Sequence, residues 1–302
     1  MDFCRNIEFP KFKKPTALRL CRFQEDMRNF TFQLKQYEFY LTVFCVLINI
    51  FHFIILTKPA MRTSSVNLIM AAIAFSDICS FLHGIEQLYI RLSRILGNCL
   101  ETTTYGFVLL EVPFFMLTDF SRRCSTWLCL SIAFIRTLVI RNPMDPFYQN
   151  LTKPKTAYFI IIAVFLTGIS LGIFKMFEFT IESYDIESCC NSSITIHAFY
   201  NRVSDTFLAN DAIILNSYHA VDAAFSNLIP CLLFPVVTFL LIKELWKTDE
   251  NRRKILSTSK TTDSKRTTNL VLVFTFTFFI AQFPFGLNSA LGYIFIETPG
   301  LM

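Results

Sequence analysis

Several charged and amide side chains stand inside stretches of sequence that are otherwise apolar. Asp77 ends the run NLIMAAIAFSD, and Asn49 lies in an earlier apolar run. Ionisable groups in such surroundings are costly and usually serve a function. A carboxylate there needs a cation, water or an amide as its partner. Asp77 is therefore a candidate polar site, and a buried acid with a purely structural role is the alternative.

A second group of charges lies in a later apolar run. Asp119, Arg122 and Arg123 have the i, i+3 and i+4 spacing that lets one acid pair with either arginine on a helix. If this helix ends near Ile140, a rise of about 20 residues places the group near the outer membrane boundary. It is either an interface cluster with its charged ends in water or the floor of a ligand pocket that binds an anionic or amide group.

The segment 178–222 is long and acidic, and we expect a loop there. Its acids produce a negative field that would steer a cationic ligand inward. A solvated loop without such a role is the alternative. The acids face a single basic residue, Arg202, and they are Glu178, Glu182, Asp185, Glu187, Asp205, Asp211 and Asp222.

Patterns of enzyme chemistry are not found in the sequence. It has no glycine-rich phosphate loop and no His-Glu-x-x-His zinc motif, and only 8 glycines and 4 histidines. We therefore expect neither an enzyme nor a bound cofactor. The basic residues lie mainly in the N-terminal tail and in alternate loops, so we expect no nucleic-acid partner.

The elements that carry these residues are long apolar segments. The chain is 53% hydrophobic and only 17% charged, and a bilayer is crossed by about 20 apolar residues in a helix. Strands of a membrane barrel would alternate in polarity, so we predict an all-α membrane protein, a bundle of transmembrane helices. The predicted spans are 37–56, 66–85, 114–140, 157–177, 223–242 and 268–296.

The basic residues of the loops predict the orientation. The loops after spans 1, 3 and 5 hold 13 Lys and Arg residues and the opposite loops hold three, so the first set is cytoplasmic. We expect a multi-pass plasma-membrane protein with an extracellular tail, 1–36, and a short extracellular end, 297–302. The eight basic residues of the tail oppose this orientation. Glycosylation sequons at Asn29 and Asn191 agree with it.

Sequence motifs in these spans resemble those of rhodopsin-like G-protein-coupled receptors. Such receptors place a proline seven residues after the arginine that ends span 3, as Arg136 and Pro143 do here. Asp77, Asn49 and Pro230 match the acid of span 2, the asparagine of span 1 and the proline of span 5. A closer resemblance, over nearly the whole chain, is to the nematode serpentine receptor class w. It lies in residues 123–128 (RCSTWL), 133–140 (AFIRTLVI) and 264–268 (SKRTT).

The resemblance implies a receptor for a neuropeptide or another chemosensory ligand, here a cationic or amidated peptide. In such receptors span 6 swings outward about its proline, Pro284, and Arg136 engages a heterotrimeric G protein. Asp77 would hold an internal sodium ion and water. Cys99 would pair with Cys189 or Cys190. The implied activation switch comprises Asn49, Asp77, Phe278, Gln282 and Pro284, and the ligand contacts comprise Asp119, Arg122, Arg123, Glu182, Asp185 and Glu187.

The chain departs from the family pattern at three places. Ile135 replaces the acid before Arg136, and Gln282 replaces the tryptophan of span 6. The sequence ends at Met302, so we expect six of the seven spans. Three readings stay open: a fragment or short isoform, a six-span protein that pairs with a complete receptor as a dimer, and a degenerate product. A small transporter is the rival class.

Overall fold

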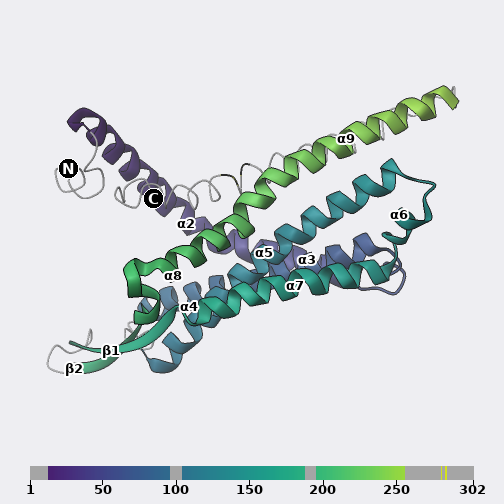
Figure 1. Ribbon diagram of the computed structural model, residues 1–302. Helices are drawn as coiled ribbons and strands as arrows, with labels where there is room; N and C mark the ends of the chain where they lie inside the picture. Colours follow the sequence, from purple (N-terminus) through teal and green to yellow (C-terminus); the bar gives the residue numbers. More distant parts are fainter. Residues whose placement is uncertain (1–12, 96–103, 188–194, 256–279, 281–282, 284–302) are drawn as a thin grey trace.

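The computed structural model describes residues 13–95, 104–187 and 195–255, with Ile280 and Phe283, and Figure 1 shows these parts as a bundle of long helices. Four helical segments are long and apolar enough to cross a membrane: Ser65–Ile90, Tyr105–Arg141, Pro154–Met176 and Ala212–Thr248. A shorter apolar segment, Tyr40–Leu56, ends the first helix. The prediction of an all-α membrane bundle is confirmed. The predicted span 268–296 lies outside the described residues, apart from Ile280 and Phe283.

Helix α2 runs from Lys14 to Leu56 without interruption. Its 43 residues correspond to about 65 Å of helix, roughly twice the thickness of the hydrocarbon core. Residues 14–36 of the expected tail therefore form the first half of one helix with the predicted span 37–56. Cys21, in this first half, is disulfide-bonded and buried.

The second span is built from two helices, α3 (Ser65–Ser80) and α4 (Leu82–Ile95), which are separated at Phe81. Such a break releases backbone carbonyls from their helical partners. The Thr118 hydroxyl of α5 donates a hydrogen bond of 3.1 Å to one of them, the carbonyl of Ser80. A polar side chain on the neighbouring span thereby stabilises the break.

Helix α5 (Tyr105–Arg141) is the centre of the bundle, and it packs against α3, α7 and α9. Around its C-terminal half, the core contains Leu128 and Ile135 with Leu68 and Ile69 of α3. Helix α7 (Pro154–Met176) approaches α5 closely at Gly168, where an added Cβ would lie 3.0 Å from the Phe120 ring.

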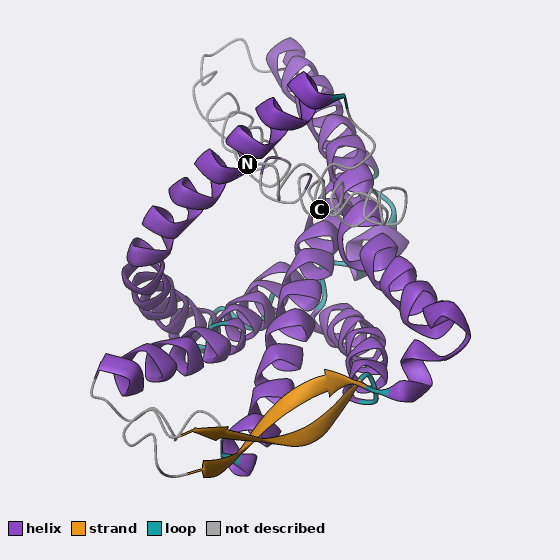
Figure 2. Ribbon diagram, turned by 90° about the vertical axis from the view of Figure 1, so that its left-hand side faces the viewer, coloured by secondary structure: helices purple, strands orange, loops and turns teal. Residues whose placement is uncertain are grey.

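A two-stranded hairpin follows α7, where we expected a loop, so that expectation was wrong. Strands β1 (Phe179–Glu187) and β2 (Thr195–Val203) pair antiparallel, with Glu182 opposite Tyr200. Their β-branched and aromatic residues favour strands. Figure 2 shows the hairpin at one end of the helix bundle.

The fifth span is longer than predicted and contains a change of helix type. It comprises α8 (Asp205–Ala223), the π-helical segment Ala224–Leu228 and α9 (Ile229–Ile255), in immediate succession. The predicted span 223–242 thus covers only its middle. A short helix, α6 (Pro146–Asn150), lies in the loop between α5 and α7, and the Asp145 carboxylate caps it by accepting from the Phe147 amide.

Candidate functional site

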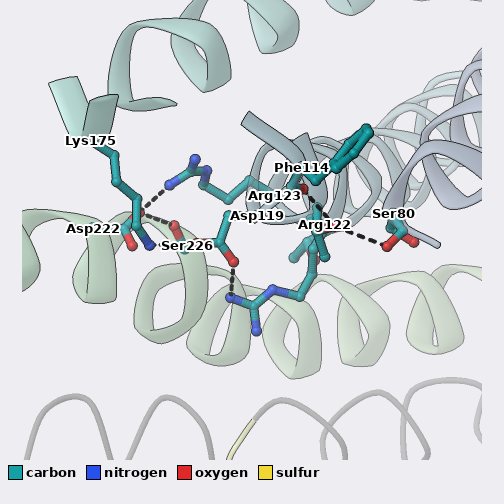
Figure 3. Close-up of polar contacts among 10 residues, drawn as sticks. Ser80, Phe114, Asp119, Arg122, Arg123, Lys175, Asp222 and Ser226 are labelled. Atoms are coloured by element: carbon teal, nitrogen blue, oxygen red, sulfur yellow. Dashed lines mark hydrogen bonds and ion pairs between the residues drawn. The ribbon is translucent and has the colours of Figure 1, made fainter. Parts of the chain in front are cut away.

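Asp119 on α5 binds two cations (Figure 3). Its Oδ2 lies 2.8 Å from Nζ of Lys175, at the end of α7, and its Oδ1 lies 3.4 Å from Nη2 of Arg122. Lys175 also lies over the Phe115 ring, 4.1 Å from its centre, which is a cation–π distance. The lysine is 8% exposed and Arg122 is 40% exposed. Arg122 is therefore the accessible cation of the two.

Arg123 pairs with a different acid because consecutive residues of a helix point about 100° apart. Its Nη1 lies 2.5 Å from Oδ1 of Asp222 on α8. The Ser226 hydroxyl donates to the same oxygen at 2.7 Å. The Arg123 side chain is only 2% exposed. Within the described part of the chain, its buried Nε and Nη2 have no hydrogen-bond acceptor.

The charged residues of this group lie on three spans, near the end of the bundle that carries the hairpin. We call them the polar cluster: Asp119, Arg122, Arg123, Lys175 and Asp222. We predicted that Asp119, Arg122 and Arg123 form one group, and the structure places them on one turn of α5. Sequence reasoning missed Lys175 and Asp222. Lys175 falls inside the predicted span 157–177, and a lysine at that depth is a signal in its own right. Asp222 was assigned to the acidic loop.

The π-helical segment lies immediately after the polar cluster and is held by Trp127. In this helix type a backbone N–H donates to the carbonyl five residues earlier, as Ile229 does to Ala224. The next residue is Pro230, which has no N–H, so the Phe225 carbonyl lacks that partner. The Trp127 indole supplies a donor at 3.1 Å, and its ring stacks on Phe225 with 4.8 Å between centroids.

The hairpin is fixed to the N-terminal turns of α5 by the side-chain amide of Asn201. Nδ2 of Asn201 on β2 donates to Glu111 Oε2 at 2.9 Å and to the Val108 carbonyl at 3.2 Å. The Tyr105 and Phe199 rings meet edge to face, 5.4 Å apart. The hairpin and the N-terminal turns of α5 are thus bound together.

Two of the seven acids expected to steer a cationic ligand, Glu182 and Asp185, are engaged within the hairpin. Glu182 accepts hydrogen bonds from Tyr200 at 2.8 Å and from Arg202 at 2.6 Å. These two bonds lower the pKa of Glu182, and the same glutamate raises the pKa of Tyr200. Asp185 lies 2.5 Å from Nδ1 of His197. Only the backbone of Glu187, which pairs with Thr195, is described.

Asp77 faces α5 and not the first helix. Its Oδ1 accepts a hydrogen bond of 2.6 Å from the Ser125 hydroxyl. Asn49 instead donates to the Cys45 carbonyl of its own helix at 3.1 Å. Among the described residues, no group of three or more His, Cys, Asp or Glu side chains could hold a metal ion. The sodium site at Asp77 stays a prediction.

Arg136 lies near the C-terminal end of α5 with its side chain exposed. In the described parts of the chain it forms neither an ion pair nor a hydrogen bond. Its neighbour Ile135, which replaces the usual acid, is buried in the core. Beyond the helix, the Pro143 carbonyl accepts from Gln149 Nε2 at 2.8 Å and so ties the loop to α6.

The other predicted site residues divide by location. Asn29 is exposed on α2. Outside the described residues lie three predicted switch positions, the predicted disulfide and the second sequon: Phe278, Gln282, Pro284, Cys99, Cys189, Cys190 and Asn191.

Comparison with known proteins gives two findings. The family model described as "Serpentine type 7TM GPCR chemoreceptor Srw" matches residues 36–302. A relative in Caenorhabditis elegans, the G-protein coupled receptor dmsr-1, is 23% identical over 252 residues. That alignment covers 76% of this chain and 46% of the relative. The chain thus spans about half the length of the curated relative it matches.

Proposed function

The chain belongs to the serpentine 7TM GPCR chemoreceptor family Srw, and from this premise we propose that it binds an extracellular ligand and activates a heterotrimeric G protein. The ligand is a neuropeptide or another chemosensory molecule. The observation that carries the proposal is the layout of one helix, α5. It carries part of the polar cluster near one end and, near the other, the exposed Arg136, which has no ion pair or hydrogen bond among the described residues. About 25 Å of helix separates Asp119 from Arg136.

In this proposal the ligand enters from the hairpin side. It shifts the receptor only through a difference in affinity for two conformations. Span 6 moves outward about Pro284, and Arg136 then binds the G-protein α-subunit. The exposure of Arg136 supports this role, because no described group competes for its guanidinium.

The proposed topology places the N-terminal half of α2 and the hairpin outside the plasma membrane. The disulfide-bonded Cys21 supports this orientation, because disulfides persist in oxidising compartments. It agrees with the basic loops on the other side.

The test is G-protein activation in cells that express the full chain, challenged with a panel of amidated neuropeptides. Wild type is compared with Arg136→Ala, and Arg141→Ala is the matched control because Arg141 is also exposed on the last turn of α5. We expect Arg136→Ala to abolish the response at unchanged surface expression, and Arg141→Ala to keep most of it. A response that survives Arg136→Ala would exclude the coupling role. If the wild-type chain reaches the cell surface but gives no G-protein response, that result would count against signalling by this chain alone.

A further inference from the structure

Helix α2 carries a continuous line of apolar side chains on its exposed side, which we call the α2 stripe. From Phe23 to Ile55 a large apolar residue recurs at alternating steps of four and three positions, without exception. Each of these side chains is between 45% and 68% exposed. The α2 stripe comprises Phe23, Met27, Phe30, Leu34, Tyr37, Leu41, Phe44, Ile48, Phe51 and Ile55.

The α2 stripe lies on the side of the helix that faces away from the bundle. The contacts of α2 with α3 and α4 involve Phe53, whose ring centre lies 6.0 Å from that of Phe75, and Thr42, whose methyl group would lie 3.4 Å from a Cβ at Gly84. At about 100° per residue, Thr42 and Phe53 point roughly 150° away from the middle of the stripe. The packing of the bundle therefore leaves the stripe uncovered.

Lipid accounts for only part of the α2 stripe. The apolar segment of α2 begins at Tyr40, and about 40 Å of the same helix precedes it. Figure 1 shows this N-terminal half projecting away from the other labelled helices, and the proposed topology places it in water. Its four stripe residues, from Phe23 to Leu34, stand there among charged and polar neighbours. Apolar surface exposed to water is costly, and a contiguous patch of it marks an interaction site.

The spacing of the α2 stripe indicates that its partner is another helix. Two apolar positions in every seven residues form the seam of a coiled coil, in which each side chain inserts between four residues of the facing helix. The repeat keeps its phase from Phe23 to Ile55, across the start of the membrane segment. Lipid would cover the membrane half alone and a soluble protein the outer half alone. The partner is thus a helix that extends along both halves.

From the spacing, exposure and continuity of the α2 stripe, we propose that two copies of this chain pair through α2 as a parallel coiled coil. A second α2 has the required length of 43 residues. It also has the required depth and direction, because every copy crosses the membrane in the same orientation. Parallel pairing places Asp26 of one copy beside Thr31 of the other, so that no like charges meet at this flank of the outer seam.

The size of the α2 stripe and the position of the nearby sequon agree with this pairing. Ten half-exposed side chains of this kind provide roughly 1,000 Å² per copy, and a stable interface needs about 800 Å² from each partner. Asn29 points about 130° away from the outer part of the stripe, so a glycan there would not obstruct the second helix. The inference goes beyond the proposed function, because it rests on the proposed topology of α2 and not on signalling.

The first test is disulfide cross-linking of the full chain in cell membranes under mild oxidation. Met27→Cys and Leu34→Cys each place a thiol in the outer part of the α2 stripe, where the facing residues are close enough for a disulfide. Glu25→Cys and Arg28→Cys are the matched controls, because both residues are exposed on the other side of the same turns. We expect most of each stripe variant to migrate as a covalent dimer, and the controls to stay at the wild-type level. Absence of this dimer, or equal dimer in the controls, would overturn the proposal.

A second test separates the pair of copies without disturbing the bundle. Met27→Glu/Leu34→Glu places like charges along the outer seam, on side chains that are exposed within a single chain. Energy transfer between donor- and acceptor-labelled copies in cells should fall to the level of an unrelated membrane protein at equal surface expression. Glu25→Gln/Arg28→Gln should keep the wild-type signal, and transfer that persists in the double glutamate variant would reject pairing through α2. A dimer that is silent in the G-protein assay would reject the proposed function alone.

Discussion

The two ends of α5 differ in how their arginines are held. Nearer the N-terminal end, Arg123 is buried and paired with Asp222, and Arg122 shares Asp119 with Lys175. Near the C-terminal end of α5, Arg136 is exposed and has no charged partner in the described parts of the chain. The difference indicates that Arg122 and Arg123 contribute to the stability of the bundle itself, while Arg136 is left open to a partner from outside the chain.

The largest expected effect on stability is at the buried ion pair between Arg123 and Asp222. Asp222→Asn leaves the buried Arg123 without a counter-charge, and we expect a loss of roughly 3–5 kcal/mol in the free energy of unfolding. The unfolding midpoint in detergent and the surface expression should both fall. The matched control is Asp205→Asn, the same change in an exposed pair with Arg202 at 3.4 Å, which should cost about 0–1 kcal/mol. Equal losses in the two variants would contradict the claim that the buried Arg123–Asp222 pair stabilises the bundle.

A smaller loss is expected where α5 holds the fifth span. Trp127→Phe keeps an aromatic ring against Phe225 but removes the donor to its carbonyl. The expected cost is about 1 kcal/mol, measured as a lower unfolding midpoint. Trp127→Ala, which also loses the stacking, should cost more. If the phenylalanine variant is as stable as wild type, the hydrogen bond to the π-helical segment adds nothing.

The hairpin should show a weaker, pH-dependent effect. The pKa of Glu182 is lowered by Tyr200 and Arg202, so its contribution is complete above the ordinary range of a glutamate and is lost as pH falls through the lowered pKa. Hydrogen exchange of the hairpin amides should therefore accelerate in acid below that ordinary range. Glu182→Gln should remove this acid dependence, and a wild-type profile without it would show that the contact has no effect on strand pairing.

The smallest effect on stability is expected at Arg136, near the C-terminal end of α5. Arg136→Gln breaks no contact that the structure describes, so the unfolding free energy should change by less than about 0.5 kcal/mol. The measurement is the same unfolding midpoint. A large loss would show that Arg136 has a structural partner, and the contrast between the two ends of α5 would then disappear.

The sequence predicted where helices lie better than it predicted the ion pairs between them. Helix α7 (Pro154–Met176) differs from the predicted span 157–177 by only a few residues, because continuous apolarity dominates the pattern. It predicted that Asp119, Arg122 and Arg123 form a group, because helical spacing alone places them together. It could not predict that Arg123 turns to Asp222, because that pairing depends on how the fifth span packs on α5.

Two local features escaped sequence reasoning for different reasons. Strand β1 was hidden by its acids, Glu182, Asp185 and Glu187, which suggested a solvated loop although β-branched and aromatic residues stand beside them. Strand β2 has no acid, but it lies in the same segment and was assigned to the loop with it. The π-helical segment leaves no periodic signal in five residues. Pro230 was matched to the family's proline of span 5, but its effect on the Phe225 carbonyl and on Trp127 needed the backbone geometry.

The π-helical segment also bears on how this chain diverges from its relatives. Its i→i+5 hydrogen bonds accommodate one residue more than an α-helix of the same length would hold. A relative that lost this segment would lack a single residue in the middle of a membrane span, where insertions and deletions are otherwise poorly tolerated. Correct alignment of such a pair would require a one-residue gap near 224–228, and without it every position of the fifth span on one side of that point would be compared with the wrong helix face.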